Sequence, residues 1–457
     1  MNWKNQRVLI IGAARQGLAL ARYLSEQGAE VVLTDLRSEK DLMAEKESLS
    51  DCSIDWALGE HPLQLLEGTT LVCPSGGVPL TIPLLLEAKK QGIPFSNDAQ
   101  IFLEAAPCKV IGITGSAGKT TTSTLVHLMA KAAVVKGLYK QAFIGGNIGN
   151  PLIAELDQMT QDDFAVMELS SFQLEQFTSS PKVSALLNIT PNHLDRHVTM
   201  EAYTNSKQNI LKFQNPEDFA IVGREDQIAW ESKSNTKGNI LSFGHSILDT
   251  DQFGTFIKDG HIWLKHAEGE SQIMPVEEVT LLGDHNLLNV LAACAIAAAS
   301  GLPIETMRTG INSFEGIPHR LEFVRNWGGA DWYNDSIATA PERSMAGIRS
   351  FEQPLLLLAG GRDKDLPWDD FAKLVAEKVD HVILFGESVD VILTALNNTQ
   401  GDYSVSSCTN LASAVDIASK IVSSGDVVLF SPGGTSYDEF FDFAERGEKY
   451  IELVNAL

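Results

Sequence analysis

Short apolar runs alternate with amphipathic stretches along most of the chain. The first example is "VLIIG" at residues 8–12, which is followed by a mixed stretch up to Gly28 and then by "EVVLTD" ending at Asp35. Short apolar runs bounded by glycine are typical of buried strands, whereas an apolar period of about 3.6 residues is typical of a helix. The pattern therefore predicts a strand, a helix and a second strand, which together form a βαβ unit.

The same alternation recurs in two later segments. In the middle of the chain "VIGITG" begins at Val110, "DDFAVME" ends at Glu168 and "LLNIT" begins at Leu186. After Gly316 the runs "PLLLLAGG", "HVILFG" and "DVVLFSPGG" follow one another. Alternating strands and helices favour mostly parallel sheets, and a chain of 457 residues is too long for one core. We expect an α/β protein with three domains, which are a Rossmann-like domain at 1–105, a P-loop ATPase-like domain at 106–315 and a second Rossmann-like domain at 316–457.

The charge balance of the chain argues against several partners. There are 59 acidic and 35 basic residues, which give a net charge of -24. Such a field repels nucleic acid and anionic membranes, and no apolar run is long enough to cross a bilayer. The N-terminus lacks the pattern of a signal peptide, and the five cysteines have no paired spacing. We therefore expect a cytoplasmic protein with reduced thiols that neither binds nucleic acid nor inserts into membranes.

The stretch "TGSAGKTTT" in the middle segment has the composition of a phosphate-binding loop. A predicted strand ends in glycines that are followed by Lys119, Thr120 and a predicted helix. Backbone amides and a helix N-terminus can surround phosphates, a lysine adds charge, and a threonine hydroxyl can bind magnesium. The strict motif would place glycine where Ile113 stands, so an incidental glycine turn is the alternative interpretation.

Two further patterns in the middle segment suggest metal chemistry. Glu168 ends the second predicted strand of this segment, where an acid could bind magnesium beside the phosphate loop. His193, Asp195 and His197 follow the third predicted strand and could form a transition-metal site. A single histidine at a magnesium–phosphate site is the milder alternative, because neither cysteine nor H-E-x-x-H supports zinc.

The first segment contains an incomplete dinucleotide fingerprint. The middle glycine, which allows backbone to approach a pyrophosphate, is replaced by Ala14, and Asp35 stands where an acid could hold a ribose. Ordinary NAD binding is therefore disfavoured. A nucleotide site of another kind and a purely structural βαβ unit both stay open.

Six motifs taken in order resemble the Mur ligase family. They are "GITGSAGKTT", "GGNIGNP", "ELSSFQLE", "LNITPNHLDRH", "GDHNLLNVLAA" and "GIPHRLE". The similarity covers all three segments, and "ELSSFQLE" with "HLDRH" is most similar to members that add D-glutamate to UDP-N-acetylmuramoyl-L-alanine for peptidoglycan precursors. The resemblance implies an ATP-dependent ligase that forms an acyl phosphate, with ATP, two magnesium ions and a carbamylated Lys207. It also implies that these two small molecules are its substrates. We expect the chain to be a monomer.

The resemblance assigns roles to individual residues. Catalysis and metal binding would fall to Lys119, Thr120, Glu168, His193 and carbamylated Lys207, although spacing alone predicts that Lys207 is a solvated helix residue. The ATP site would comprise Gly115, Ser116, Ala117, Gly118, Lys119, Thr120, Thr121, Asn286, Asn289, Arg320 and Asp335. The UDP-sugar would contact Arg15, Gln16, Asp35, Arg37, Gly77, Asn147, Ser170 and His193. The incoming amino acid would contact Thr339, Lys364, Ser436 and Phe443.

One position departs from the family pattern. Ile337 stands in "DSIATAPER" where many relatives have a lysine. The sequence therefore predicts the stereoisomer of the added glutamate, D or L, less clearly than it predicts glutamate itself. Arg343 follows close by. The alternatives are a sister ligase that adds another residue, a folylpolyglutamate synthetase, an inactive nucleotide-binding protein and a nicotinamide-dependent oxidoreductase. Lys364 favours an acidic amino acid as substrate, because a neutral or basic amino acid would leave the lysine cation without an anionic partner.

Overall fold

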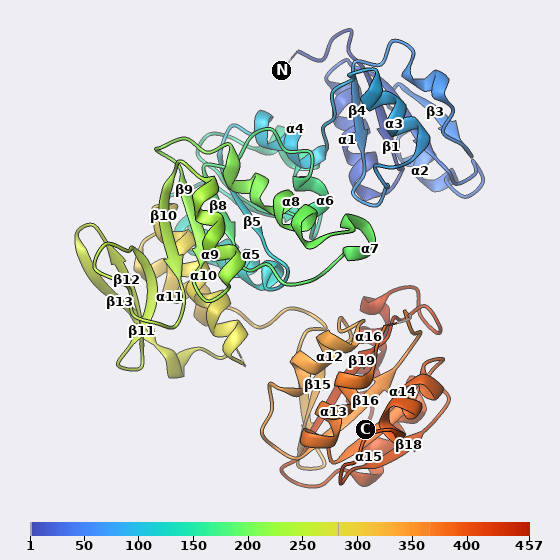
Figure 1. Cartoon of the computed structure of the whole chain (residues 1–457), viewed down its shortest axis with the longest axis vertical. Coiled ribbons are helices and arrows are strands. Elements are labelled where there is room, and N and C mark those ends of the chain that lie inside the picture. The colour runs from blue at the N-terminus through green and yellow to red at the C-terminus, as the bar shows by residue number, and fades with distance from the viewer. Residues whose placement is uncertain (1, 282, 365) are drawn as a thin grey trace. The chain divides into compact units, whose positions relative to one another are not determined.

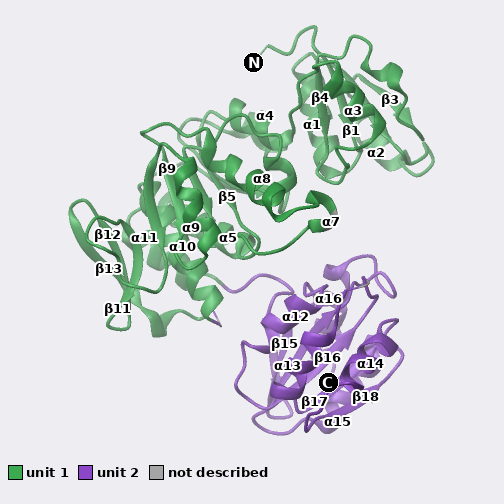
Figure 2. Ribbon diagram, in the orientation of Figure 1, with its two compact units in different colours: residues 1–280, 284–314 green, residues 281–283, 315–457 purple. Residues whose placement is uncertain are grey.

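The chain divides into two compact units, which are coloured separately in Figure 2. A computed structural model describes residues 2–281, 283–364 and 366–457. The first unit comprises residues 1–280 and 284–314, and the second comprises residues 281–283 and 315–457. The three domain boundaries predicted from the sequence stay predictions, and the first two of those domains share one compact unit.

The N-terminal part of the first unit is a parallel sheet with strand order β3-β2-β1-β4. Figure 1 shows α1 and α3 among the helices that pack on this sheet. The strands are β1 (Arg7–Ile11), β2 (Glu30–Asp35), β3 (Ile54–Leu58) and β4 (Leu71–Pro74). The helices are α1 (Arg15–Glu26), α2 (Met43–Ser48), α3 (Pro83–Lys90) and α4 (Asp98–Ala105), with a 3₁₀ turn η1 (Leu63–Leu66).

The middle part is built on a nine-stranded sheet in the order β13-β12-β11-β10-β9-β8-β5-β7-β6. The strands are β5 (Lys109–Thr114), β6 (Ala142–Gly146), β7 (Phe164–Glu168), β8 (Val183–Leu186), β9 (Phe219–Gly223), β10 (Asn239–Phe243), β11 (Gly254–Lys258), β12 (His261–His266) and β13 (Gly269–Pro275). The helices are α5 (Lys119–Val135), α6 (Ser171–Leu174), α7 (Leu194–His197), α8 (Met200–Lys212), α9 (Gln227–Glu231), α10 (Asp284–Ala299) and α11 (Ile304–Asn312). Three 3₁₀ turns complete this part, η2 (Leu152–Gln158), η3 (Ser232–Asn235) and η4 (Val276–Glu278). Neighbouring strands from β6 to β11 in this order are parallel, so their carboxyl ends meet at one edge.

The second unit has a six-stranded sheet in the order β14-β15-β19-β16-β17-β18. The strands are β14 (Glu322–Trp327), β15 (Ala330–Asn334), β16 (Leu355–Gly360), β17 (His381–Phe385), β18 (Ser404–Ser407) and β19 (Val427–Gly433). The helices are α12 (Pro341–Ile348), α13 (Asp369–Lys378), α14 (Val389–Asn397), α15 (Leu411–Ile421) and α16 (Phe443–Asn455). Among the described strand pairs of this sheet, only β14–β15 is antiparallel. The predicted α/β fold with mostly parallel sheets is therefore confirmed.

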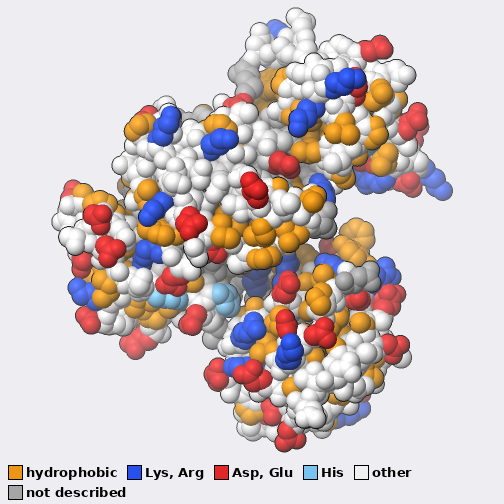
Figure 3. All heavy atoms as spheres, viewed as in Figure 1, with side chains coloured by type: hydrophobic (Ala, Val, Ile, Leu, Met, Phe, Trp, Pro, Cys, Tyr) orange, Lys and Arg blue, Asp and Glu red, His pale blue; other side chains and the backbone are white. Residues whose placement is uncertain are grey.

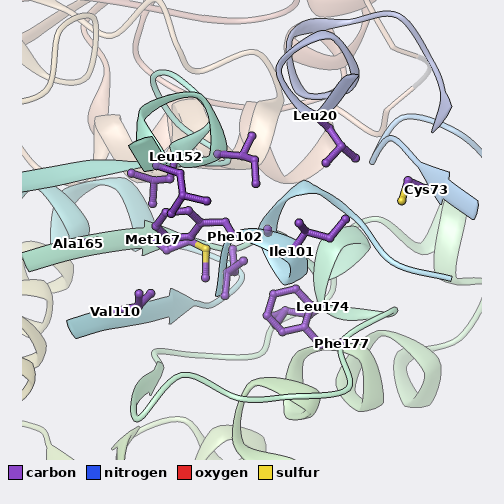
Figure 4. Close-up of a cluster of buried hydrophobic side chains, with 14 of the residues drawn as sticks. Leu20, Cys73, Ile101, Phe102, Val110, Leu152, Ala165, Met167, Leu174 and Phe177 are labelled. Atoms are coloured by element: carbon purple, nitrogen blue, oxygen red, sulfur yellow. The ribbon is translucent and has the colours of Figure 1, made fainter. Parts of the chain in front are cut away.

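One apolar core joins the two parts of the first unit. Helix α4 begins at Asp98 because the Asn97 side chain accepts a hydrogen bond from the Gln100 amide. The helix then buries Ile101 and Phe102 among side chains of both parts, as Figure 4 shows. The same cluster contains Leu20 of α1 and Cys73 of β4 from the N-terminal part and Val110, Ala165, Met167, Leu174 and Phe177 from the middle part. The two sheets thus share one buried apolar cluster.

The surface carries charges of both signs. On the face drawn in Figure 3, acidic and basic side chains are interspersed and do not gather into one basic surface. Among the described residues, no helix combines the length and apolar character needed to span a bilayer. All five cysteines carry free thiols.

We predict that Phe102→Ala lowers the free energy of unfolding of the first unit by about 3–5 kcal/mol, because it leaves a cavity in the shared core. Phe102 is 1% exposed, whereas Leu86 on α3 is 53% exposed, so Leu86→Ala serves as the matched control. Denaturant unfolding of both variants measures the difference. Equal loss in the two variants would show that the cluster does not join the two parts.

Candidate active site

The predicted phosphate loop lies at the carboxyl end of β5, between β7 and β8. Residues 115–118 form the turn and α5 begins at Lys119, so the predicted strand–turn–helix is present. Gly118 has a φ of +81°, and a Cβ there would lie 2.2 Å from Oδ1 of Asn289. Only glycine fits this close approach, and the resulting turn directs amides and a helix N-terminus to one place, which suits an anion.

Lys119 lies over its own loop. Its Nζ donates to the carbonyl oxygens of Gly115 at 2.9 Å and Ser116 at 3.3 Å. The Ser116 hydroxyl contacts the Tyr203 hydroxyl at 2.9 Å, which ties the loop to α8. Positive charge is therefore held where phosphate oxygens would meet the loop amides.

Glu168 accepts hydrogen bonds from polar side chains that follow the two strands next to its own. It is 1% exposed, and its carboxylate accepts hydrogen bonds from the Thr120 hydroxyl at 2.9 Å and the Asn147 amide at 2.8 Å. Gly146 pairs with Glu168 in register, has a φ of +99°, and would place a Cβ 2.4 Å from the Glu168 carbonyl oxygen. The structure thus joins the acid and the threonine that the sequence predicted for magnesium, and adds Asn147, which was predicted to contact the sugar.

Lys207 is buried beside the same loop. It is 2% exposed, and its Nζ donates to the Gly115 carbonyl at 2.9 Å and contacts the Thr114 hydroxyl at 3.4 Å. Burial, and next the charge of Lys119, lower the pKa of Lys207 to about 6, although Glu168 opposes the shift. The solvated position expected from spacing alone is wrong, because α8 turns this face toward β5.

His193 lies beside an aromatic side chain from another motif. It has a φ of +54° and precedes α7, and its ring meets the Phe172 ring edge-on with centroids 5.1 Å apart. Ser170 precedes Phe172 and forms a capping box with Gln173, so its hydroxyl is used at the start of α6. The side chain of Asp195 lies outside the described part. Among the described residues, which do not include the side chain of Asp195, no group of three or more His, Cys, Asp or Glu could hold a metal ion.

A cavity of about 180 Å³ opens beside the phosphate loop. Asn289 lines it, and Asn289 also donates to the Asn286 side chain at 3.1 Å. Asn188 was not predicted from the sequence, yet it exchanges two hydrogen bonds with the Ala117 backbone at 2.8 and 3.1 Å. Other lining residues were not predicted either, and these include Leu187, Asp226, Phe243 and His285. Asn188 follows β8 at the same sheet edge as the loop, and that position could have identified it.

A second cavity of about 190 Å³ lies at the carboxyl ends of the N-terminal strands and is lined by Asp35 and Gly77. Asp35 accepts hydrogen bonds from the Ala13 amide at 2.8 Å and from the Arg37 side chain at 3.0 and 3.1 Å. Burial raises the pKa of Asp35, but the bonds from Arg37 and Ala13 and the Arg37 charge outweigh it and hold the pKa at about 2. The carboxylate therefore anchors the loop after β1, close to Arg15 at the start of α1. Gln16 lines a smaller cavity on another side of that loop.

In the second unit the predicted amino-acid residues follow strands that are neighbours in the sheet. Thr339, Lys364 and Ser436 come after β15, β16 and β19, and Phe443 begins α16. The buried Arg446 side chain links the loops after β15 and β19, because it donates hydrogen bonds to the carbonyls of Ser336 at 2.9 Å and Gly434 at 3.1 Å.

Asp335 and Arg320, which were predicted to contact ATP, also lie in the second unit. Burial raises the pKa of Asp335 to about 7, although the hydrogen bond from Ser431 at 2.7 Å and the charge of Arg320 act against this. Arg343 on α12 contacts the Ile337 carbonyl at 3.5 Å. A guanidinium therefore reaches the segment in which Ile337 stands in place of a lysine.

Three family models match the chain in order. They are the Mur ligase MurD-like N-terminal domain at residues 6–96, the Mur ligase middle domain at 113–297 and the Mur ligase glutamate ligase domain at 319–434. Together they cover most of both units.

Similar proteins match over nearly their whole lengths. UDP-N-acetylmuramoylalanine--D-glutamate ligase of Alkaliphilus metalliredigens is 36% identical, with 100% of this chain and 99% of that protein covered. The protein of the same name from Acetivibrio thermocellus is 35% identical, with coverages of 99% and 97%. Among solved structures, UDP-N-acetylmuramate-alanine ligase of Thermotoga maritima has a TM-score of 0.60 and 18% identity, with coverages of 98% and 99%, and indicates a shared fold.

We predict that Asp335 makes the stability of the second unit depend on pH. Because its folded pKa of about 7 lies above the unfolded value of 3.8, the folded state binds more protons between these values, and stability falls as pH rises. Denaturant unfolding without ligands should show a loss of about 2 kcal/mol from pH 5 to 7.5 that Asp335→Asn abolishes. Asp331→Asn on the same strand is the matched control, and an unchanged slope in Asp335→Asn would contradict the assignment.

Proposed function

The chain belongs to the Mur ligase family, and we propose that it joins D-glutamate to UDP-N-acetylmuramoyl-L-alanine at the expense of ATP, a step in peptidoglycan precursor synthesis. The observation that carries the proposal is full-length similarity at 35–36% identity to ligases of that name. The buried Glu168–Thr120 pair beside a glycine-rich loop supports ATP chemistry at the same place. We further propose that the protein works as a cytoplasmic monomer.

The proposed reaction activates a carboxylate. The terminal phosphoryl group of ATP passes to the alanine carboxylate of the acceptor, which gives an acyl phosphate and ADP. The glutamate amine then attacks the acyl carbon, phosphate leaves, and the amine loses a proton as the amide forms. No side-chain nucleophile is required, so positioning and neutralisation of phosphate charge supply the catalysis. We assign phosphate binding to Lys119 and to the amides of residues 115–121.

The residues beside the loop fit a hard divalent cation. A threonine hydroxyl and a carboxylate, both oxygen ligands, lie within hydrogen-bond distance at Thr120 and Glu168, and magnesium prefers such ligands. We assign these two residues to one magnesium ion and His193 to a second. When bound, the metal neutralises charge on the transferring phosphoryl group.

We propose that Lys207 is carbamylated in the active protein. A lysine with a pKa of about 6 is largely a neutral amine at neutral pH, and a neutral amine can add CO₂ with release of a proton. The carbamate would replace this neutral amine by an anion beside Lys119. It would thus add an oxygen ligand next to Glu168, and its negative charge would favour binding of a divalent cation.

The remaining assignments divide the substrates between the two units. We assign the UDP-sugar to the cavity lined by Asp35 and Gly77 in the first unit. We assign glutamate to the loops of Thr339, Lys364 and Ser436 and to Phe443, with Arg343 as the cation on the Ile337 segment. A lysine, an arginine and two hydroxyls suit a dicarboxylate.

The decisive assay supplies ATP, magnesium and UDP-N-acetylmuramoyl-L-alanine with D-glutamate or L-glutamate and measures phosphate release and product mass. We expect product with the D isomer alone. We predict that Lys119→Ala lowers the rate about a hundredfold or more, since a phosphate-site charge is lost, whereas Lys131→Ala on the exposed face of α5 does not. Product from another amino acid would assign a different ligase of the family, and full activity of Lys119→Ala would refute the phosphate site.

We predict a carbamate signal from Lys207. Protein equilibrated with ¹³C-bicarbonate at pH 7.5 should show one slowly exchanging carbamate resonance that disappears in Lys207→Met and persists in Lys212→Met, a change on the same helix. Removal of CO₂ should lower the activity and bicarbonate should restore it. An active enzyme with an unmodified amine would refute this prediction.

A further inference from the structure

Arg196 joins the short helix that follows His193 to the N-terminal part of the first unit. Its guanidinium donates to three successive carbonyl oxygens, those of Gly76 at 3.4 Å, Gly77 at 3.0 Å and Val78 at 3.1 Å. These residues follow β4 and include the wall of the cavity that we assign to the UDP-sugar. A charged donor that satisfies three carbonyls of one turn constrains the conformation of that turn strongly.

The guanidinium is itself held in place by an aromatic ring. Arg196 lies 4.7 Å from the centroid of the Phe172 ring, and the same ring stacks on His197 at 5.2 Å with planes 4° apart. A Cβ added to Gly76 would lie 3.8 Å from Cβ of Phe172, so the turn also packs against this side chain. Two motifs of the middle part, "SSFQLE" and "HLDRH", therefore act together on one turn of the N-terminal part.

Peptide geometry shows what this contact does to the turn. In a trans peptide the N–H points opposite to the preceding carbonyl, so the Gly77 amide points away from the guanidinium that binds the Gly76 carbonyl. The Val78 amide is used within the turn, because it donates to the Ser75 carbonyl at 2.9 Å. A cation at the carbonyl end of a peptide and an outward N–H form a dipole that favours an anion on the N–H side.

Arg196 is not needed merely to hold the two parts together. That attachment is already provided by α4 and by the shared apolar cluster around Ile101 and Phe102. The contact of Arg196 is polar and local, and it is directed at one turn of a ligand cavity.

We propose that Arg196 is a positioning residue for the sugar nucleotide. It fixes the turn at residues 76–78 so that the Gly77 amide meets the diphosphate of the bound substrate. This inference rests on the proposed function and adds a residue for which the sequence alone suggested no role.

The test is a binding and kinetic comparison of full-length variants. Arg196→Met should weaken binding of UDP-N-acetylmuramoyl-L-alanine about tenfold in calorimetry and raise its KM similarly, with kcat at saturation and the KM values of ATP and glutamate little changed. Arg196→Lys should restore part of the affinity. Arg308→Met is the matched control, because Arg308 also donates to backbone carbonyls, those of Gln272 and Ile273, in a region outside both cavities.

The outcomes separate this inference from the proposed function. If the wild-type protein does not bind the UDP-sugar, the proposed function fails. If the wild-type protein binds it and Arg196→Met binds it equally well, the positioning role is overturned. Equal rises in the KM of all three substrates would also overturn it, because they indicate general destabilisation. Should Arg196→Met fail to fold, Arg196→Lys decides, and wild-type affinity in that variant would refute the proposal.

Discussion

Glu168 carries a carboxylate that is almost wholly removed from water, and the surrounding site is arranged around it. A buried ionised group must be matched by donors or cations, because its lost hydration is otherwise uncompensated. The Thr120 hydroxyl and the Asn147 amide supply two hydrogen bonds, and Lys207 contributes a nearby group whose charge depends on its own burial. Strand order makes this possible, since β5, β7 and β6 are neighbours and end at the same edge. The ends of three strands thereby form one polar site.

Much of this arrangement follows from local sequence. The glycine-rich loop, the strand that ends at Glu168 and the alternating pattern of the last segment are short-range signals, and each predicts its element correctly. Asn188 was missed because its partner is the backbone of Ala117, far away in the chain. Lys207 was misjudged from spacing, since a helix shows which residues share a face but not which face will be buried. Contacts between distant segments depend on tertiary packing that no local pattern contains.

The same limit applies to charged side chains. Asp35 at the end of β2 has the position of a ribose-binding acid, yet it accepts hydrogen bonds from Ala13 in the loop after β1 and from Arg37 two residues further along the chain. Ile337 stands where many relatives have a lysine, and the Arg343 side chain, from the first turn of α12, contacts the carbonyl of Ile337. Both residues can be read from the sequence, but only the structure shows that the Arg343 side chain reaches the segment of Ile337. Residue roles therefore depend on geometry even where the family is established.

The apolar cluster that joins the two parts of the first unit has a consequence for biosynthesis. Phe102 leaves the ribosome roughly 75 residues before Phe177, which packs in the same cluster. At about 5–20 residues per second this interval lasts several seconds, during which one face of the nascent N-terminal segment has no covering partner. The opposite face of its sheet closes earlier, around Leu9, Val72 and Leu85. The emerging chain thus exposes apolar surface on one face of the N-terminal sheet only. Exposed apolar surface of this kind is what chaperones bind on nascent chains.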